Sequence, residues 1–264
     1  MAERSLLHSL REQHSGDMKT TGNTLLITGA TSGIGLGLAL RFHAAGNRVI
    51  VAGRRTELLE TIVAEHPGID SLELDVADPD SIARAFTAVT ASHPDLNMVI
   101  NMAGIMRPEN LREASFLATS EATITTNLLG TIRVTAAFTE FLQQKQDAVI
   151  MNVSSGLAFV PLAATPTYNA TKAAVHSFTE ILRLQLADTS VEVLELIPPA
   201  VQTALLGQEN DPNAMPLEEF LAEVMDILTN RPEEKQVMVE RVKFLRNAEI
   251  EGRYPQVLAL LAGH

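Results

Sequence analysis

Cysteine is absent from this chain of 264 residues, and so is tryptophan. Without cysteine the protein has no disulfide, no thiolate metal site and no cysteine nucleophile. Its seven histidines are scattered and form no HExxH or similar pair, so the sequence predicts no metal site. No apolar run approaches the about 20 residues that a membrane-spanning helix needs. We therefore expect neither a metal-dependent nor a membrane-spanning protein.

Positive charge is also scarce. The chain has 20 lysines and arginines against 32 aspartates and glutamates, which gives a formal net charge of -12. This balance argues against binding to nucleic acid or to an anionic membrane surface. The start of the chain lacks the apolar core of a signal peptide. Together with the lack of cysteine, this predicts a reducing, cytoplasmic setting.

Short apolar runs alternate with longer helical patterns over the first 200 residues. The alternation predicts an α/β fold, a doubly wound parallel sheet flanked by helices. Six runs read as strands buried on both faces, at 24–28, 48–53, 71–74, 97–101, 148–153 and 191–196. Helical patterns cover 33–45, 55–66, 79–92, 113–144 and 166–188. Residues 236–239 read equally well as a seventh strand or as the start of a helix.

No repeat or linker interrupts this pattern, so residues 18–264 are predicted to form a single domain. Residues 1–17 are predicted to be an N-terminal extension, either disordered or helical. After Ile197 the alternation ends, and a stretch with prolines precedes an amphipathic stretch at 217–230. Such a break beyond the end of a strand predicts a substrate lid over 198–230. The alternative is a surface loop that has no function in ligand binding.

A glycine-rich turn, TGATSGIG at 28–35, follows the first strand and opens a helix. Gly29 allows a sharp turn, and Gly33 and Gly35 let the backbone approach a pyrophosphate at the helix N-terminus. The alternative is a tight turn that binds nothing. The position at the first strand of an alternating fold favours the dinucleotide site.

Two arginines, Arg54 and Arg55, follow the second strand, where this architecture meets the adenosine ribose. An acidic residue there would bind a 2′-hydroxyl, whereas arginine binds a phosphate in a bidentate manner. We therefore expect NADP(H), with a solvated arginine pair as the alternative. Asp75 ends the third strand, where it is placed to accept a hydrogen bond from the adenine amine.

Tyr168 precedes Lys172 by four residues, so the two side chains share one face of a helix. An ammonium favours the phenolate and lowers the tyrosine pKa from ~10, which makes the phenol useful as an acid or base. The alternative is a chance surface pair.

Further polar candidates stand at the strand ends. Ser155 ends the fifth strand, and Val201 and Thr203 follow the sixth. All these groups lie where ligands bind in such sheets.

The ordered set of TGxxxGIG at 28–35, NxAG at 101–104, Asn127, Ser155 and YxxxK at 168–172 resembles the short-chain dehydrogenase/reductase superfamily over about residues 22–205. The stretch around Ser155 and Tyr168 further resembles an oxidoreductase group named after the D-alanyl-lipoteichoic acid operon. The resemblance implies a Rossmann-like sheet of six to seven strands and a nicotinamide cofactor. It also implies a homodimer or homotetramer.

The resemblance assigns roles to four residues. Tyr168 is expected to exchange a proton with the substrate oxygen, and Ser155 to orient and polarise the carbonyl. Lys172 is expected to bind the nicotinamide ribose and to lower the Tyr168 pKa. Asn127 is expected to anchor a water that links Lys172 to solvent.

The expected NADP(H) site comprises residues from every strand end, and the substrate pocket is expected to be apolar. The cofactor set is Gly29, Thr31, Ser32, Gly33, Ile34, Gly35, Arg54, Arg55, Asp75, Val76, Asn101, Ala103, Gly104, Tyr168, Lys172, Pro198, Val201 and Thr203. The pocket set is Leu157, Phe159, Leu162, Leu205 and Leu206, each of which could equally be core. Two residues depart from the family pattern: Met102 replaces the second asparagine of NNAG, and Pro199 replaces a glycine.

These features predict an NADP(H)-dependent oxidoreductase that interconverts a carbonyl compound and its alcohol, that is, a carbonyl reductase or alcohol dehydrogenase. A small-molecule substrate is the expected partner. The alternatives are an NADP(H)-binding regulatory protein on the same fold without turnover, and a lyase or isomerase that uses the same tyrosine.

Overall fold

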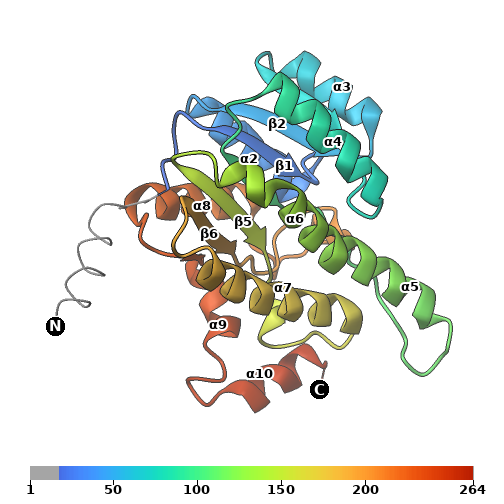
Figure 1. Ribbon diagram of the computed structural model, residues 1–264. Coiled ribbons are helices and arrows are strands. Elements are labelled where there is room, and N and C mark those ends of the chain that lie inside the picture. Colours follow the sequence, from blue (N-terminus) through green and yellow to red (C-terminus); the bar gives the residue numbers. More distant parts are fainter. Residues whose placement is uncertain (1–17, 264) are drawn as a thin grey trace.

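The computed structural model describes residues 18–263, so the expected extension over residues 1–17 lies outside the described residues. Its centre is a parallel sheet of seven strands in the order β3-β2-β1-β4-β5-β6-β7 (Figure 1). The strands are β1 (Thr24–Thr28), β2 (Arg48–Gly53), β3 (Ile69–Glu73), β4 (Met98–Asn101), β5 (Ala148–Val153), β6 (Val191–Leu196) and β7 (Gln236–Val237). Residues 236–237 therefore form a seventh strand, which settles the choice that the sequence left open.

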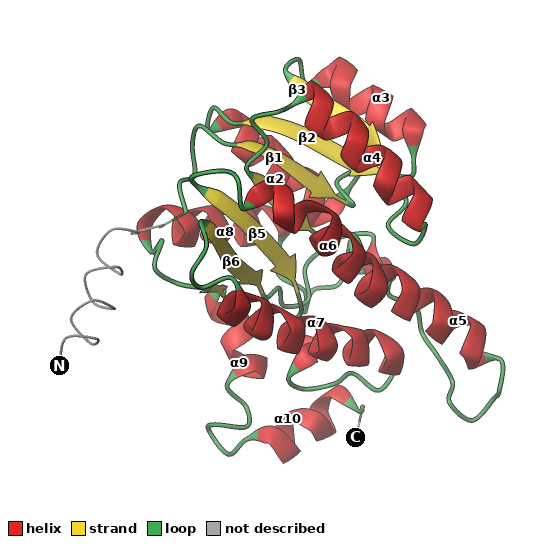
Figure 2. Ribbon diagram, viewed as in Figure 1, coloured by secondary structure: helices red, strands yellow, loops and turns green. Residues whose placement is uncertain are grey.

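Helices cover both faces of the sheet (Figure 2). One apolar core lies between the sheet and α2, α3 and α8, and a second lies between the sheet and α4 and α6. The helices are α2 (Gly33–Ala44), α3 (Thr56–Glu65), α4 (Pro79–Ser92), α5 (Phe116–Thr123), α6 (Gly130–Leu142), α7 (Pro166–Gln185), α8 (Leu217–Asn230), α9 (Lys243–Arg246) and α10 (Tyr254–Leu261). This confirms the predicted doubly wound, Rossmann-like α/β fold.

The central strands are apolar on both faces because helices cover both. In β1, Leu25, Leu26 and Ile27 are all fully buried, and their register places them beside β2 and β4. All strand pairs run parallel. The carboxyl ends of the strands therefore meet at one edge, which is where this architecture places its ligand sites.

The single helix expected over 113–144 is instead three consecutive segments. α5 passes into a π-helical turn at Ile124–Leu129, and α6 follows without a gap. π turns are rare and frequently occur at functional sites. Here the turn carries Asn127, which is fully buried.

Residues 217–230 form α8, whose residues Phe220, Leu221 and Val224 are fully buried in the core between α8 and the sheet. α8 packs so closely on α2 that a Cβ on Gly37 would lie 2.3 Å from a methyl group of Leu221. The amphipathic pattern reflects this packing, and the substrate lid over 198–230 stays a prediction.

The end of the chain folds back toward the carboxyl edge of the sheet. α9 and α10 lie beyond α7 (Figure 1) and pack through a small apolar cluster that includes Val160, Ala248 and Val257. α9 is a short helix that ends at Arg246. None of the described helices is both long enough and apolar enough to span a membrane.

Candidate functional site

Two neighbouring cavities open at the carboxyl edge of the sheet. The larger has a volume of about 520 Å³ and the smaller about 200 Å³. Met102 and Gly104, just beyond β4, line both. The two cavities therefore form one cleft with two lobes along the strand ends.

The smaller cavity lies over the glycine-rich turn between β1 and α2. Gly29 has φ +67, and a Cβ there would stand 2.7 Å from the Cα of Ala103. A side chain at Gly35 would stand 2.6 Å from the Gly29 carbonyl oxygen. The tight turn thus needs glycine at both positions. Gly29 has a positive φ and no space for a side chain, and Gly35 has no space for a side chain.

The N-terminus of α2 carries no side-chain cap hydrogen bond. The first amide groups of a helix have no partner within it, so this end offers donors and a positive dipole to an anion. Arg55 reaches over the turn, with Nη2 donating to Thr31 Oγ1 at 2.5 Å and to Ser32 Oγ at 2.8 Å. Arg54, Arg55 and Asp75 line the cavity together, so cationic and acidic groups face it from β2 and β3.

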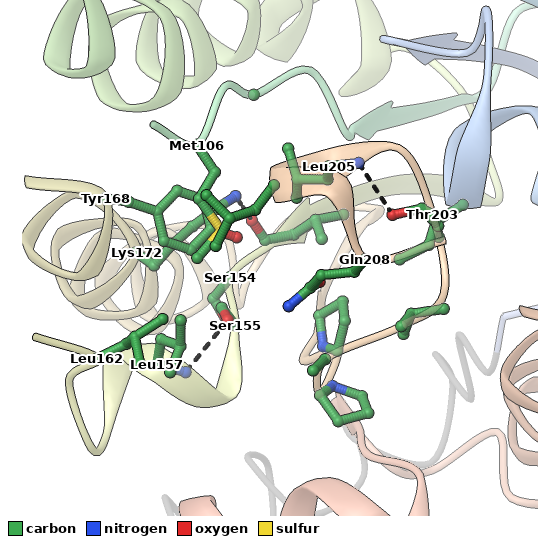
Figure 3. Close-up of a pocket in the computed structure, with 18 of the residues that line it drawn as sticks. Met106, Ser154, Ser155, Leu157, Leu162, Tyr168, Lys172, Thr203, Leu205 and Gln208 are labelled. Carbon is green, nitrogen blue, oxygen red and sulfur yellow. Dashed lines mark hydrogen bonds between the residues drawn. The ribbon is translucent and has the colours of Figure 1, made fainter. Parts of the chain in front are cut away.

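The larger cavity brings together Ser155, Tyr168 and Lys172 (Figure 3). Ser155 follows β5, while Tyr168 and Lys172 lie one turn apart on α7. Lys172 Nζ donates to the Val153 carbonyl at 2.7 Å and lies 5.6 Å from the centre of the Tyr168 ring. The expected hydroxyl–phenol–ammonium set is therefore assembled on one wall.

Burial controls the titration of this set. It raises the pKa of Tyr168 to about 12, although the hydrogen bond with Ser155 acts in the opposite direction. Burial also lowers the pKa of Lys172 to about 8. The phenol thus has a pKa above its usual value in this structure, because desolvation outweighs the hydrogen bond with Ser155. The lowering of the Tyr168 pKa by Lys172 stays a prediction.

Asn127 is not among the residues that line either cavity. Its Oδ1 accepts from the Ile105 amide and its Nδ2 donates to the Ile105 carbonyl, both at 2.8 Å. A Cβ on Gly104 would lie 3.3 Å from Asn127 Oδ1 and 3.8 Å from Lys172 Nζ. Asn127 thus holds the loop beside Lys172.

The short chain dehydrogenase family profile matches residues 23–214. The chain belongs to the short-chain dehydrogenase/reductase family. It is 39% identical over 239 residues to the uncharacterized oxidoreductase DltE of Bacillus subtilis. The match covers 88% of this chain and 93% of that protein.

Two further relatives of this short-chain dehydrogenase carry information on cofactors. The NADPH-dependent 1-acyldihydroxyacetone phosphate reductase of Schizosaccharomyces pombe is 32% identical over 183 residues, 69% of this chain and 60% of that protein. A short chain dehydrogenase from Burkholderia cenocepacia, solved in complex with NADP, superposes with a TM-score of 0.80 at 27% identity. That match covers 92% of this chain and 98% of the other.

Most of the expected site residues of this short-chain dehydrogenase line the cleft. The smaller lobe includes Gly29, Thr31, Ser32, Arg54, Arg55, Asp75, Val76 and Ala103, and Gly104 is shared. The larger includes Ile34, Ser155, Leu157, Leu162, Tyr168, Lys172, Pro198, Val201, Thr203, Leu205 and Leu206. Gly33 and Gly35 shape the turn without lining either lobe.

Two expected residues have other roles. Phe159, expected in the substrate pocket, lies outside it, because its ring packs against His176 at 4.8 Å and the Arg246 guanidinium at 4.3 Å. Asn101, expected at the cofactor, lines neither lobe. Its Nδ2 donates to Asn152 Oδ1 at 2.8 Å and braces β4 against β5. The backbone amide of Met102 donates to Thr28 Oγ1.

Sequence reasoning did not identify several residues that line the larger cavity. Met106, Gln208, Asp211 and Asn213 come from loops, and Leu245 and Leu261 from the C-terminal segment. These residues carry no local signal, because only the folded chain brings them to the cleft.

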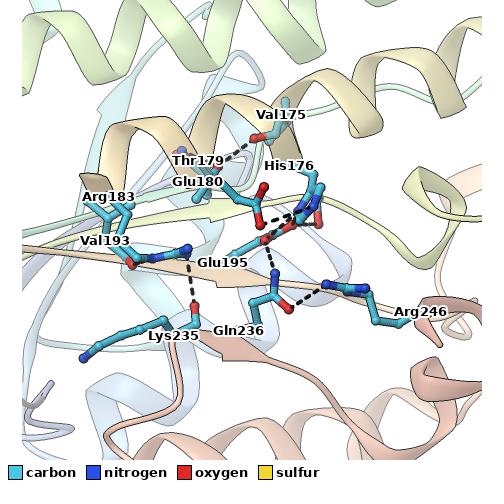
Figure 4. Close-up of polar contacts among 12 residues, drawn as sticks. Val175, His176, Thr179, Glu180, Arg183, Val193, Glu195, Lys235, Gln236 and Arg246 are labelled. Carbon is cyan, nitrogen blue, oxygen red and sulfur yellow. Dashed lines mark hydrogen bonds and ion pairs between the residues drawn. The ribbon is translucent and has the colours of Figure 1, made fainter. Parts of the chain in front are cut away.

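Ser154, which also lines the larger cavity, contacts the buried carboxylate of Glu195. Figure 4 shows Glu195 with His176 and Gln236 around it. Ser154 Oγ donates to Glu195 Oε1 at 2.5 Å, and His176 Nδ1 lies 2.9 Å from both oxygens of Glu195. Gln236 Nε2 donates to Glu195 Oε2 at 3.2 Å. Glu195 is fully buried within β6. The sequence did carry a signal here, since a glutamate inside an apolar strand requires partners.

Glu195→Ala is expected to destabilise the fold strongly, because it leaves Ser154, His176 and Gln236 without their shared acceptor. Each buried polar group left without a partner costs about 1–3 kcal/mol. Urea unfolding followed by circular dichroism measures this. The control is Glu180→Ala, which removes a half-exposed carboxylate 3.7 Å from His176 Nε2 and should change stability little. Equal effects of the two variants would contradict the assigned role of Glu195.

Proposed function

We propose that this short-chain dehydrogenase is an NADP(H)-dependent oxidoreductase that interconverts a carbonyl compound and its alcohol. One observation carries the proposal. Ser155, Tyr168 and Lys172 line the lobe that adjoins the lobe with the glycine turn and the two arginines. A dinucleotide that lies along the cleft would present one end to the phosphate-binding groups and the other to the acid/base group.

The chain's own residues fit NADP(H) well. The uncapped end of α2 suits the pyrophosphate, and Arg54 and Arg55 suit a 2′-phosphate. Asp75 lies beside them for the adenine. The cofactors named for the Burkholderia and fission-yeast relatives support the same choice. Bound NADP(H) would supply or accept the hydride.

The protein supplies the proton and the orientation. With a pKa of about 12, the Tyr168 phenol carries its proton at neutral pH and is ready to donate it to a carbonyl oxygen. Ser155 holds that oxygen from the neighbouring strand end. Lys172 would bind the nicotinamide ribose of a bound cofactor and places a positive charge near the phenol. Asn127 would support a water-mediated link from Lys172 to solvent.

Tyr168→Phe keeps the ring and removes the transferable proton. General acid/base catalysis contributes ~10²–10⁴-fold, so turnover should fall by at least that order. NADPH binding, followed by fluorescence titration, should persist. In the wild type, alcohol oxidation should accelerate as pH rises, because that direction needs the phenolate.

Tyr254→Phe is the matched control, because it changes the other tyrosine, which lines neither cavity. NADPH consumption with a panel of carbonyl compounds also separates the alternatives. A regulatory protein would bind NADPH without consuming it, and a lyase or isomerase would convert substrate without net consumption. Wild-type turnover in Tyr168→Phe would show that the assigned mechanism is wrong.

Arg54→Asp is expected to reverse or abolish a preference for NADPH over NADH. A charge-assisted contact to phosphate is worth roughly 1.5–3 kcal/mol, so the ratio of kcat/KM values should fall by roughly 10- to 100-fold. Arg112→Asp makes the same charge change at an exposed arginine that lines neither cavity and should leave the ratio unaltered. A wild-type enzyme that uses NADH as well as NADPH would contradict the cofactor assignment.

A homodimer or homotetramer is proposed on the basis of exposed apolar residues on α5, the π turn and α7. Leu117, Ile181 and Leu184 are 55%, 51% and 71% exposed. Light scattering at micromolar concentration should give a mass at least twice the 28.6 kDa of the chain. Leu184→Glu should lower that mass, whereas Ile250→Glu, at an exposed position outside these helices, should not. A monomeric wild type would refute the proposal.

The cytoplasmic location of the protein stays a prediction.

A further inference from the structure

Charge is scarce in the wall of the larger cavity. Among the described residues that line it, the only ionisable side chains besides Tyr168 are Lys172 and Asp211. Lys172 is buried and donates to the Val153 carbonyl. Asp211 Oδ1 accepts from the Asn213 amide at 2.8 Å. No arginine or histidine lines this cavity in the part of the chain that the structure describes.

The residues that line this cavity offer few binding partners for an anionic substrate. A carboxylate or phosphate that leaves water needs charged or multiple hydrogen-bonding partners, and its transfer into an apolar site is otherwise costly. Lys172 is committed to the reacting end of the site, and Asp211 would repel a second negative charge. Gln208 and Asn213 offer only neutral polar groups. The cavity therefore suits an uncharged molecule.

Apolar side chains dominate the lining, and they come from separate parts of the chain. Met106 follows β4, and Leu157 and Leu162 follow β5. Leu205 and Leu206 come from the segment after β6, and Leu245 and Leu261 come from α9 and α10. Figure 3 shows Leu205, Thr203 and Gln208 across the cavity from Tyr168 and Lys172. An apolar chain attached to the reacting carbon would thus meet leucines on several sides.

Leu206 has an uncommon backbone conformation. Its φ is 57, and it is the only residue other than glycine with a positive φ among residues 18–263. Glycine adopts this conformation without penalty, whereas a leucine is strained by it. The next residue is Gly207, with φ 69. Strained residues of this kind cluster at ligand-contacting sites, and Leu206 lines the cavity.

We propose that the substrate is an uncharged carbonyl compound with an apolar chain, and that Leu206 is a specificity-determining residue that contacts this chain. The proposal rests on the proposed oxidoreductase function. It goes beyond that function by excluding oxo acids and phosphate esters as preferred substrates. The strain at Leu206 and the scarcity of charge are independent observations that lead to the same substrate class.

The first experiment compares 2-alkanones of four to ten carbons with 2-oxo acids of equal length, as kcat/KM with NADPH. A buried methylene group contributes about fourfold, so kcat/KM should rise by about that factor per carbon until the cavity is filled. The oxo acids should be at least 100-fold poorer than the matched ketones. Oxo acids that equal or exceed the ketones would overturn the substrate class while leaving the oxidoreductase function intact.

A binding measurement keeps the two proposals separable if neither series is reduced. Calorimetry with NADPH present compares an n-alkanamide with the n-alkanoate of equal length. Tighter binding of the amide supports an uncharged apolar ligand even without turnover, in which case the oxidoreductase function alone fails. Equal or tighter binding of the alkanoate overturns the inference.

The second experiment uses Leu206→Gly, with Leu206→Met as the conservative variant. Glycine relieves the backbone strain, so the Tm should stay the same or rise. The ratio of kcat/KM for the longest ketone to that for butanone should fall on the order of tenfold, and Leu206→Met should restore most of it. A Leu206→Gly variant that keeps the wild-type ratio would show that Leu206 does not determine specificity.

Discussion

The hydrogen bond from Lys172 Nζ to the Val153 carbonyl, at 2.7 Å, ties the helix of the acid/base group to the central sheet. Val153 is the last residue of β5, and Ser155 follows two residues later. Tyr168 lies one turn before Lys172 on the same face of α7, so this bond sets how far the phenol stands from the serine. A buried ammonium without an acceptor would be strongly destabilising. The packing of α7 on the sheet brings Lys172 Nζ to its acceptor, and this acceptor in turn makes the buried ammonium tolerable.

Two buried polar networks hold the same edge of the sheet on either side of that bond. In the first, Asn101 donates to Asn152, whose Nδ2 donates to Thr179 Oγ1 at 3.0 Å, which links β4, β5 and α7. In the second, Glu195 links Ser154 to His176 and so connects β5, β6 and α7. Directional hydrogen bonds of this kind restrict how the connected elements can move, although Asn101 Oδ1 itself is buried without a hydrogen-bond partner among the described residues. Apolar packing fills the rest of the core, whereas these directional contacts fix the strand ends that carry the site.

How much the sequence could predict follows from how local each signal is. The glycine turn and the Tyr168–Lys172 pair depend on spacing along a few residues, and both lie where the pattern places them. The amphipathic stretch at 217–230 forms a helix. Its periodicity shows that one face is covered, but it does not show that this face packs against the core of the protein. Leu261 reaches the cavity through the folding of α9 and α10 onto the protein, which no local pattern encodes. Strand β3 begins two residues earlier than expected, because an edge strand that is half exposed has a weak apolar pattern.

The titration of Tyr168 is decided by burial and hydrogen bonding. Burial raises its pKa from 10.0 to about 12, and the hydrogen bond with Ser155 acts in the opposite direction without reversing the rise. Lys172 adds a positive charge nearby, since its Nζ lies 5.6 Å from the centre of the Tyr168 ring, and a nearby ammonium favours the phenolate. The phenol therefore stays protonated at neutral pH, as the donor for carbonyl reduction, and the ammonium stabilises the phenolate that donation leaves behind.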